Sequence, residues 1–325
     1  MSNFWKKIHK PVFCLAPMAD VTDCAFRQII TKYGKPDIFW TEFVSADGLA
    51  HPVAREKLLI DFRFSPNEHP IVAQIFGGNP ENIKIASELC KKLGFDGIDI
   101  NMGCPDRSIE KQGAGACMIK NPKLAREMIR AAKDGAPGLP ISIKTRIGYN
   151  KNEIDTWIRE LLSEDIAALT VHLRTRKEMS NVPAHWELMQ NVVRIRDDMK
   201  KDTLILGNGD ALDLADAKLK VKETGCDGVM LGRAIFGNPW LFSKDPSLIL
   251  PLAGKEIKRK LKVMIEHTKL YEKMLGQHKN FAIMKKHYKA YVNGFEGAKE
   301  LRVKLMEAEN ATEVEATAND FLAQI

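Results

Sequence analysis

Eight short apolar runs in the first 233 residues constrain the fold of this chain more than any other feature. Most of them alternate with helical patterns, as in residues 80–93, where Ile83, Ala86 and Leu89 recur at helical spacing. Strands that are apolar on both sides are typical of a parallel sheet with helices on both faces. The runs are residues 12–18, 38–44, 70–76, 97–103, 140–146, 168–174, 203–209 and 228–233.

This alternation predicts a (β/α)₈ TIM barrel over residues 1–245. A doubly wound open sheet is the alternative, but eight strands at this spacing favour closure into a barrel. From about residue 255 onward no strand is evident, and apolar residues recur at helical spacing instead. We therefore expect a small helical bundle over residues 246–325.

Positive charge is concentrated in the predicted helical part. Residues 255–304 contain 14 Lys or Arg and 5 Asp or Glu, a net charge of +9, whereas the whole chain carries +7. A basic segment on a nearly neutral body predicts a polyanionic partner, and a solvated helical face is the alternative. Three histidines of this part, His267, His278 and His287, are expected at the surface.

The six cysteines, at positions 14, 24, 90, 104, 117 and 226, include no C-x-x-C pair. The spacing therefore suggests neither a zinc site nor a disulfide framework, and thiols in this number fit a reducing cytoplasm. No run of about 18 apolar residues could span a bilayer, and the N-terminus lacks the apolar core of a secretory signal. We expect a cytoplasmic, monomeric protein with no metal and no membrane contact.

The sequence Asn-Met-Gly-Cys-Pro at residues 101–105 directly follows the fourth apolar run. It would place an amide and a thiol at the C-terminal end of a barrel strand, where the chemistry of this fold takes place. Gly103 is expected to turn the chain with a positive φ, and Pro105 to stop a helix from forming. Cys104 could then transfer a proton or attack a substrate, and a small buried side chain is the alternative.

The last two predicted strands end in groups that suit a phosphate. A glycine-rich turn covers residues 208–210, and Gly232 precedes Arg233; each is expected to lead into a helix. Backbone N–H groups at a helix start and an arginine fork would hold a dianion there. The phosphate is not expected to belong to a Rossmann-bound dinucleotide or a P-loop nucleotide, because neither motif is present.

Two further strand ends carry titratable groups. Lys144 could form a Schiff base, pair with a phosphate or hold an electron-rich ring oxygen. His172, two residues before Arg174, could be a base, a donor to a carbonyl or a core imidazole. Three histidines at strand ends would indicate a metal, but only one is found here.

Several motifs of this chain resemble those of the dihydrouridine synthases and follow one another in the same order. The match runs from about residue 15 to residue 302, most of the chain. Its landmarks are APM at 16–18, VTD at 21–23, AQIFG at 73–77, NMGCP at 101–105, IKTR at 143–146, HLRTR at 172–176, GNGD at 207–210 and GVMLGRAIFGNPW at 228–240. In the helical part, Lys286, His287, Tyr288, Tyr291, Gly294, Gly297 and Arg302 continue the resemblance.

The resemblance implies a barrel that binds FMN, followed by a helical domain that binds tRNA, with NADPH or NADH as the reductant. Carried over by motif, Pro17, Met18 and Ala19 line the isoalloxazine, and Gln74 and Lys144 hydrogen-bond its pyrimidine edge. His172 lies between flavin and substrate. The ribityl phosphate is held by Asn208, Gly209, Asp210, Gly232 and Arg233.

The resemblance also assigns the substrate side. Asn101 and Arg146 contact the target uracil, and Arg174 is assigned to substrate binding with them. Cys104 is the general acid. Hydride passes from reduced flavin N5 to C6 of the uracil, and the thiol protonates C5, which gives 5,6-dihydrouridine. A thiol that is mostly protonated at neutral pH suits this role.

The chain differs from the family pattern at several positions. Where the family often has Tyr and Gly, this chain has Ser180 and Val182, and Leu173 follows the histidine. Ala19 and Asp20 also stand where a Gly is common. One alternative function is a flavin reductase or dehydrogenase for a free pyrimidine such as dihydroorotate, against which the basic tail argues. Another is a flavin-containing RNA-binding protein without turnover.

Overall fold

The computed structural model describes residues 3–249 and 256–325. Its contacts divide the chain into two compact units. The first contains residues 3–17, 37–62 and 69–232, and the second contains residues 18–36, 63–68 and the described residues from 233 on. The domain boundary between residues 245 and 246 stays a prediction. Residues 250–255, within the predicted helical domain, lie outside the described residues.

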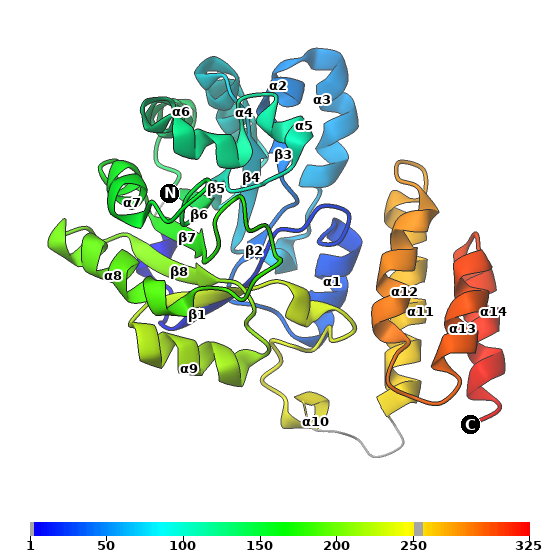
Figure 1. Cartoon of the computed structure of the whole chain (residues 1–325). Helices are drawn as coiled ribbons and strands as arrows, with labels where there is room; N and C mark the ends of the chain where they lie inside the picture. Colours follow the sequence, from blue (N-terminus) through cyan, green and yellow to red (C-terminus); the bar gives the residue numbers. More distant parts are fainter. Residues whose placement is uncertain (1–2, 250–255) are drawn as a thin grey trace. The chain divides into compact units, whose positions relative to one another are not determined.

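The first unit is built on a parallel barrel, as predicted from the alternation of strands and helices (Figure 1). The strands pair in the order β1-β9-β8-β7-β6-β5-β4-β2, and a parallel bridge between Cys14 and Ile38 joins the two ends. The strands are β1 (Val12–Leu15), β2 (Phe39–Trp40), β3 (Val44–Ser45), β4 (Ile71–Phe76), β5 (Gly97–Met102), β6 (Ile141–Arg146), β7 (Ala168–His172), β8 (Leu204–Asn208) and β9 (Gly228–Leu231).

The second predicted strand is interrupted and forms β2 and β3, both of which pair with β4. Between them, the backbone N–H of Gln74 donates to the hydroxyl oxygen of Thr41 at 3.0 Å. A side chain thus takes a hydrogen bond that a backbone carbonyl takes in a regular ladder, so the strand breaks there.

Helices surround the barrel strands in the first unit, as Figure 1 shows. Two of them begin with Asn-Pro: the side chains of Asn79 and Asn121 accept from N–H groups of the first turn, and proline occupies the first helical position. The apolar side of α4, with Ile83, Ala86 and Cys90, is fully buried. The helices are α2 (Ala46–Ala50), α3 (Pro52–Leu58), α4 (Pro80–Lys92), α5 (Arg107–Glu110), α6 (Pro122–Gly135), α7 (Ile154–Leu162), α8 (Met189–Asp198) and α9 (Leu214–Thr224).

An apolar cluster inside the first unit includes Cys14, Val72, Leu206 and Met230 from four strands. Trp5, in the segment before β1, belongs to the same cluster and is 4% exposed. Each fully buried aliphatic side chain of this kind stabilises the fold by about 1.5–3 kcal/mol. The core is therefore a packed interior and not a pore.

The second unit is helical, as the sequence predicts for the C-terminal part. Helix α1 packs against α11, where Lys32 and Tyr33 each bind Glu266 at 2.6 Å. Its helices are α1 (Cys24–Tyr33), α10 (Pro246–Ile249), α11 (Glu256–Leu275), α12 (Lys285–Tyr291), α13 (Ala298–Glu307) and α14 (Ala311–Leu322). Among the described residues, no helix is long and apolar enough to cross a membrane.

The prediction that the tail histidines lie at the surface is wrong for two of them. His267 and His287 are 0% and 1% exposed, with ring centroids 4.6 Å apart, and both rings pack against Phe26 of α1. Phe26 lies far away in the sequence, so the local pattern could not show that this helical face is covered. His278 is exposed, as predicted.

Candidate active site

Cys104 lies on the loop that leaves β5, and Asn101 fixes the shape of this loop. The side-chain oxygen of Asn101 accepts from the backbone N–H groups of Gly103 and Cys104, at 3.1 and 2.9 Å. The positive φ expected for Gly103 is wrong, because Gly103 is not among the left-handed residues. A Cβ at Gly103 would lie 3.1 Å from the backbone of Thr145, so close approach, and not φ, favours glycine there.

A buried hydrogen-bonded chain extends from Asn101 into the barrel. Asn101 Nδ2 donates to Gln74 Oε1 at 3.2 Å, and Gln74 Nε2 donates to Asp99 Oδ2 at 2.7 Å. Ser142 donates to the other oxygen of Asp99 at 2.6 Å. Burial raises the pKa of Asp99 to about 6, although the hydrogen bonds from Ser142 and Gln74 oppose this effect. The loop that carries Cys104 is thereby anchored to three neighbouring strands.

Asp99 was missed by the sequence analysis. The signal was present: it is an acidic residue within an apolar run, and the strand register places it directly beside Gln74. A buried carboxylate needs donors, so a polar partner on the neighbouring strand was to be expected.

The Cys104 thiol is partly buried, and burial is the main cause that raises its pKa above the ordinary value. The largest opposing effect is a backbone hydrogen bond at Asp106, and the effects of Arg146 and Lys144 are smaller still. The thiol therefore keeps its proton at neutral pH. Chemically it is suited to donate a proton and is a poor nucleophile in this state.

Arg146 joins the Cys104 loop to the loop that follows β7. Its Nε donates to the carbonyl of Gly103 at 2.7 Å, and its Nη1 donates to the carbonyls of Thr175 and Met179, at 3.1 and 2.8 Å. Arg146 is 6% exposed, and burial lowers its pKa to about 10, so it remains charged at neutral pH. Within the described residues, its Nη2 atom makes no hydrogen bond, so it has donors to spare at the strand ends.

Lys144 ends next to Asn208 in the barrel mouth. Its Nζ donates to Asn208 Oδ1 at 3.1 Å, and Asn208 Nδ2 donates to the carbonyl of Met230 at 2.7 Å. Burial, and secondly Arg146, lower the pKa of Lys144 to about 8. No other acceptor for Lys144 Nζ is found in the described part of the chain. The same holds for the second N–H of Gln74, so both side chains can donate to a ligand rich in oxygen or nitrogen acceptors.

Arg174 connects His172 to Asp210. Its Nη1 lies 3.0 Å from His172 Nε2, its Nη2 pairs with Asp210, and its Nε donates to the carbonyl of Val182 at 2.6 Å. A guanidinium only donates, so His172 Nε2 is the acceptor in this contact. Arg174 is 2% exposed, and its contacts show that it orients His172.

The turn after β8 requires glycine. Gly209 has φ +125°, and a Cβ there would lie 2.8 Å from Ala184. The indole N–H of Trp186 donates to the Gly209 carbonyl at 2.7 Å, and Asp210 accepts from the N–H of Ala184 at 2.9 Å. Helix α9 starts five residues later, so the turn does not lead directly into a helix as expected, and Gly209 itself is buried.

Three predicted site residues, Met18, Ala19 and Arg233, belong to the second unit. Met18 is held in a turn by Thr22, whose hydroxyl accepts from its N–H at 2.9 Å. Arg233 opens the 3₁₀ turn η6 (Arg233–Ile235) and not the longer helix expected after the last strand. The sequence continues with Gly-Asn-Pro, which stops further helix. Pro17 belongs to the first unit and is partly exposed.

The loop after β7, which carries Ser180, is held by residues that the sequence analysis did not single out. Glu178 accepts from the N–H of Thr175 at 2.7 Å and lies 3.0 Å from Nε2 of His185. Met179 has φ +57° and is 38% exposed, while Ser180 is exposed. An apolar side chain and a short hydroxyl thus occupy the tip of this loop.

The comparisons with known proteins agree on one family. The family model "Dihydrouridine synthase (Dus)" matches residues 14–325. A "Probable tRNA-dihydrouridine synthase" of Staphylococcus aureus is 41% identical over 324 residues, 99% of this chain and 97% of that protein. The "Probable tRNA-dihydrouridine synthase 2" of Bacillus subtilis is 41% identical over 320 residues, 98% and 96% of the two chains.

Among solved structures, "Morphinone reductase" has a similar fold. Its TM-score is 0.52 at 13% sequence identity, and the match covers 77% of this chain and 93% of that one. At this identity the similarity concerns the fold alone, and it agrees with the barrel described above.

Proposed function

The chain belongs to the dihydrouridine synthase family, and from this premise we propose that it reduces the C5–C6 double bond of a uridine in tRNA to 5,6-dihydrouridine. As a member of this family it is a flavin oxidoreductase. The flavin is FMN, and NADPH or NADH is the reductant. The main support from the fold is the Cys104 thiol, protonated at neutral pH and held at a strand end beside Arg146.

The donor set of the first unit fits a flavin. Lys144 and Gln74 have N–H groups without acceptors among the described residues, and a flavin's pyrimidine edge is a row of oxygen and nitrogen acceptors. The Gly209 turn has no room for a Cβ, because Ala184 and His172 fill that space, so a glycine keeps the turn packed beside His172. We assign the cofactor to Pro17, Met18, Ala19, Gln74, Lys144, His172, Asn208, Gly209, Asp210, Gly232 and Arg233. Bound and reduced, the flavin supplies the hydride that C6 of the uracil receives.

Cys104 supplies the proton that C5 needs. Hydride addition at C6 leaves negative charge shared between C5 and the O4 carbonyl, and donors aimed at O4 stabilise it. Arg146 Nη2 and the second amide N–H of Asn101 are available for this, since neither makes a hydrogen bond to a described residue. We assign Asn101, Arg146 and Arg174 to the substrate side, with Arg174 acting through His172 and Asp210.

The target base must leave its stack in a folded RNA, which costs a few kcal/mol. Phosphate contacts to the basic second unit offset this cost. Lys258, Lys262, Lys273 and Lys289 are exposed there and make no ion pair with a described residue. RNA affinity is therefore expected to fall steeply as salt rises.

The function is tested with the purified protein, unmodified tRNA transcripts and NADPH. Mass spectrometry of the digested RNA should find dihydrouridine at one or a few positions, with NADPH oxidised in equal amount. Turnover of dihydroorotate or free uridine without RNA would favour the small-molecule reductase instead. RNA binding without any NADPH-dependent product would favour a protein that has lost turnover.

A further inference from the structure

A cavity of about 750 Å³ lies at the end of the barrel opposite to Cys104. It is lined by the segments that lead into β1, β6, β7 and β8, including Pro140, Ala167 and Thr203 just before three of these strands. All of its lining residues belong to the first unit. Since TIM-barrel chemistry takes place at the C-terminal strand ends, this cavity is not part of the site proposed above.

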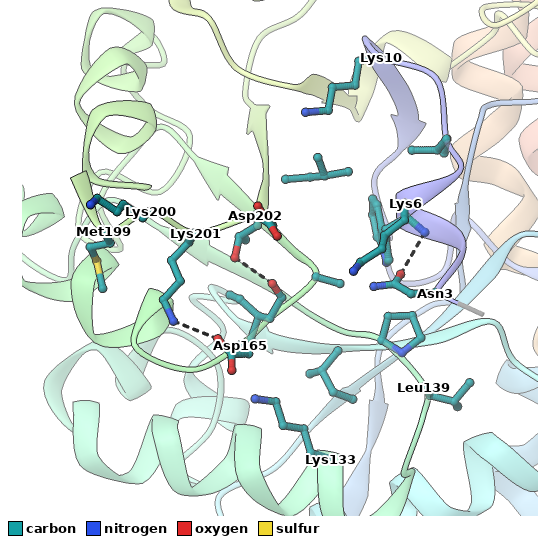
Figure 2. A pocket seen from close by; sticks show the side chains of 18 residues that line it. Asn3, Lys6, Lys10, Lys133, Leu139, Asp165, Met199, Lys200, Lys201 and Asp202 are labelled. Carbon is teal, nitrogen blue, oxygen red and sulfur yellow. Dashed lines mark hydrogen bonds and ion pairs between the residues drawn. The ribbon is translucent and has the colours of Figure 1, made fainter. Parts of the chain in front are cut away.

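The cavity is strongly basic. Five lysines and two aspartates line it, a net charge of +3. The lysines come from separate segments and stand around the opening, as Figure 2 shows; they are Lys6, Lys10, Lys133, Lys200 and Lys201. A concave surface with an excess of positive charge attracts anions.

Most of this charge is not neutralised by the protein. Lys10 pairs with Asp227 at 2.6 Å, and Lys201 pairs with Asp165 at 2.9 Å. Lys6, Lys133 and Lys200 form no ion pair within the described residues. The remaining aspartate of the lining, Asp202, is exposed.

Lys200 has a backbone conformation that is unusual for a lysine. It follows α8 with φ +52°, in the left-handed conformation that glycine favours at the end of a helix. The N–H groups of Lys200 and Lys201 close the helix end by donating to the carbonyls of Asp197 and Arg196, at 2.9 and 3.1 Å. The chain thus keeps a lysine at the cavity where a glycine would be less strained.

Part of the wall between the lysines is apolar. Trp5, Ile8, Leu139, Pro140, Ile166 and Met199 line the same cavity. A bare phosphate would gain nothing from such walls, whereas a ring next to the phosphates would bury apolar surface against them. The volume lies within the range of about 300–1,000 Å³ that is usual for sites of ring-bearing ligands.

We propose that this cavity is a second ligand site, which binds a nucleoside phosphate. Its base or ribose lies on the apolar wall near Ile8 and Met199, and its phosphates lie between Lys6, Lys133 and Lys200. A nucleotide bound here is separated from the Cys104 end by the packed interior of the barrel, so it does not compete with the flavin.

Calorimetric titration of the flavin-loaded enzyme with ADP at low salt tests the proposal. ADP should bind, and pyrophosphate should bind at least tenfold more weakly, because it lacks the ring. The triple variant Lys6→Gln, Lys133→Gln, Lys200→Gln should weaken ADP binding at least tenfold. A matched triple, Lys57→Gln, Lys111→Gln, Lys222→Gln, removes three exposed lysines of the same unit outside the cavity and should bind ADP as the wild type does.

A light-activated azido derivative of ADP locates the site independently. It should attach to peptides that contain residues 3–10 or 199–204, and the flavin spectrum should not change when ADP binds. The proposal is overturned if ADP fails to bind the wild type or if pyrophosphate binds equally well. It is also overturned if both triple variants weaken ADP binding alike, or if the label attaches at the Cys104 loop.

Discussion

The Nε atom of Arg146 donates a 2.7 Å hydrogen bond to the carbonyl of Gly103, the residue before Cys104. The same guanidinium binds the carbonyls of Thr175 and Met179 on the loop after β7. One planar side chain therefore sets the relative position of the proton donor and of the loop with Ser180 at its tip. This arrangement explains why the site needs an arginine, and not only a positive charge, at position 146.

Arg146→Lys tests this role. A lysine keeps the charge but cannot reach three carbonyls in the plane of a guanidinium. Product formation is expected to fall by about 100-fold or more, because the donors that stabilise the charge at O4 are lost. Flavin content and its rate of reduction by NADPH should stay near the wild-type values. If Arg146→Lys makes dihydrouridine at the wild-type rate, the guanidinium group is not required at this position.

The lowered pKa of Lys144 predicts that flavin binding depends on pH. Its pKa is lowered to about 8, so it is charged below this pH and increasingly neutral above it. Flavin affinity should therefore be constant below about pH 7 and decrease as the pH rises through 8. Lys144→Met should bind flavin about 10- to 100-fold more weakly, as expected for the loss of a hydrogen bond from a charged donor, and without this transition. Equilibrium dialysis over a pH series measures both; a transition that persists in Lys144→Met would assign it to another group.

Gly209→Ala separates steric overlap from backbone strain. Gly94 also has a positive φ, +86°, but a Cβ there meets nothing within 4 Å, whereas at Gly209 it would lie 2.8 Å from Ala184. Gly94→Ala should cost about 1 kcal/mol of unfolding free energy from strain alone. Gly209→Ala should cost about 1–3 kcal/mol more and reduce flavin retention. Urea unfolding and flavin content after dialysis measure the difference; equal costs would contradict the tight turn.

The buried histidines predict loss of stability in acid. Burial lowers the pKa of His287 to about 3 and that of His267 well below its ordinary value. The unfolded chain, with an ordinary histidine pKa of about 6.5, therefore binds protons that the folded state does not. The free energy of unfolding is therefore highest above about pH 6.5 and decreases as the pH falls toward the pKa values of the two histidines in the folded state. At pH 5 the loss should be on the order of 2 kcal/mol for His287.

His287→Phe keeps a ring against Phe26 and removes the titration, so it should lose less stability between pH 7 and pH 5 than the wild type. His278→Gln, at an exposed position, is the matched control and should behave as the wild type does. Urea unfolding at pH 7 and at pH 5 measures the loss of unfolding free energy in each protein. Equal losses in the wild type and in His287→Phe would place the acid sensitivity elsewhere.

The barrel could be predicted from the sequence because its strands are short, apolar on both sides and regularly spaced. The eight runs coincide with the observed strands to within a few residues, except where the Thr41 hydroxyl interrupts the second. The burial of His267 and His287 could not be predicted, since it depends on Phe26, which lies more than 200 residues earlier. Packing between distant segments leaves no local periodicity.

The residue types of the candidate site can be read from the sequence, and they stay a prediction, whereas its contacts cannot be read there. The motifs select Cys104, Lys144 and Arg146 as strand-end groups, and the structure places all three at the same end of the first unit. The connection of Arg174 to Asp210 spans 36 residues, and only the folded chain brings them together. Asp99 is an acid inside an apolar strand, and its role becomes clear only where the folded chain places it beside Gln74.

The most direct test of the proposed chemistry is Cys104→Ala, followed with two measurements on one preparation. Without the thiol proton, dihydrouridine in tRNA, measured by mass spectrometry, should fall by about 10²–10⁴-fold. Flavin content and the rate at which NADPH reduces the flavin should be unchanged. If Cys104→Ala forms dihydrouridine at the wild-type rate, the proton at C5 comes from another group and the proposed role of Cys104 is wrong.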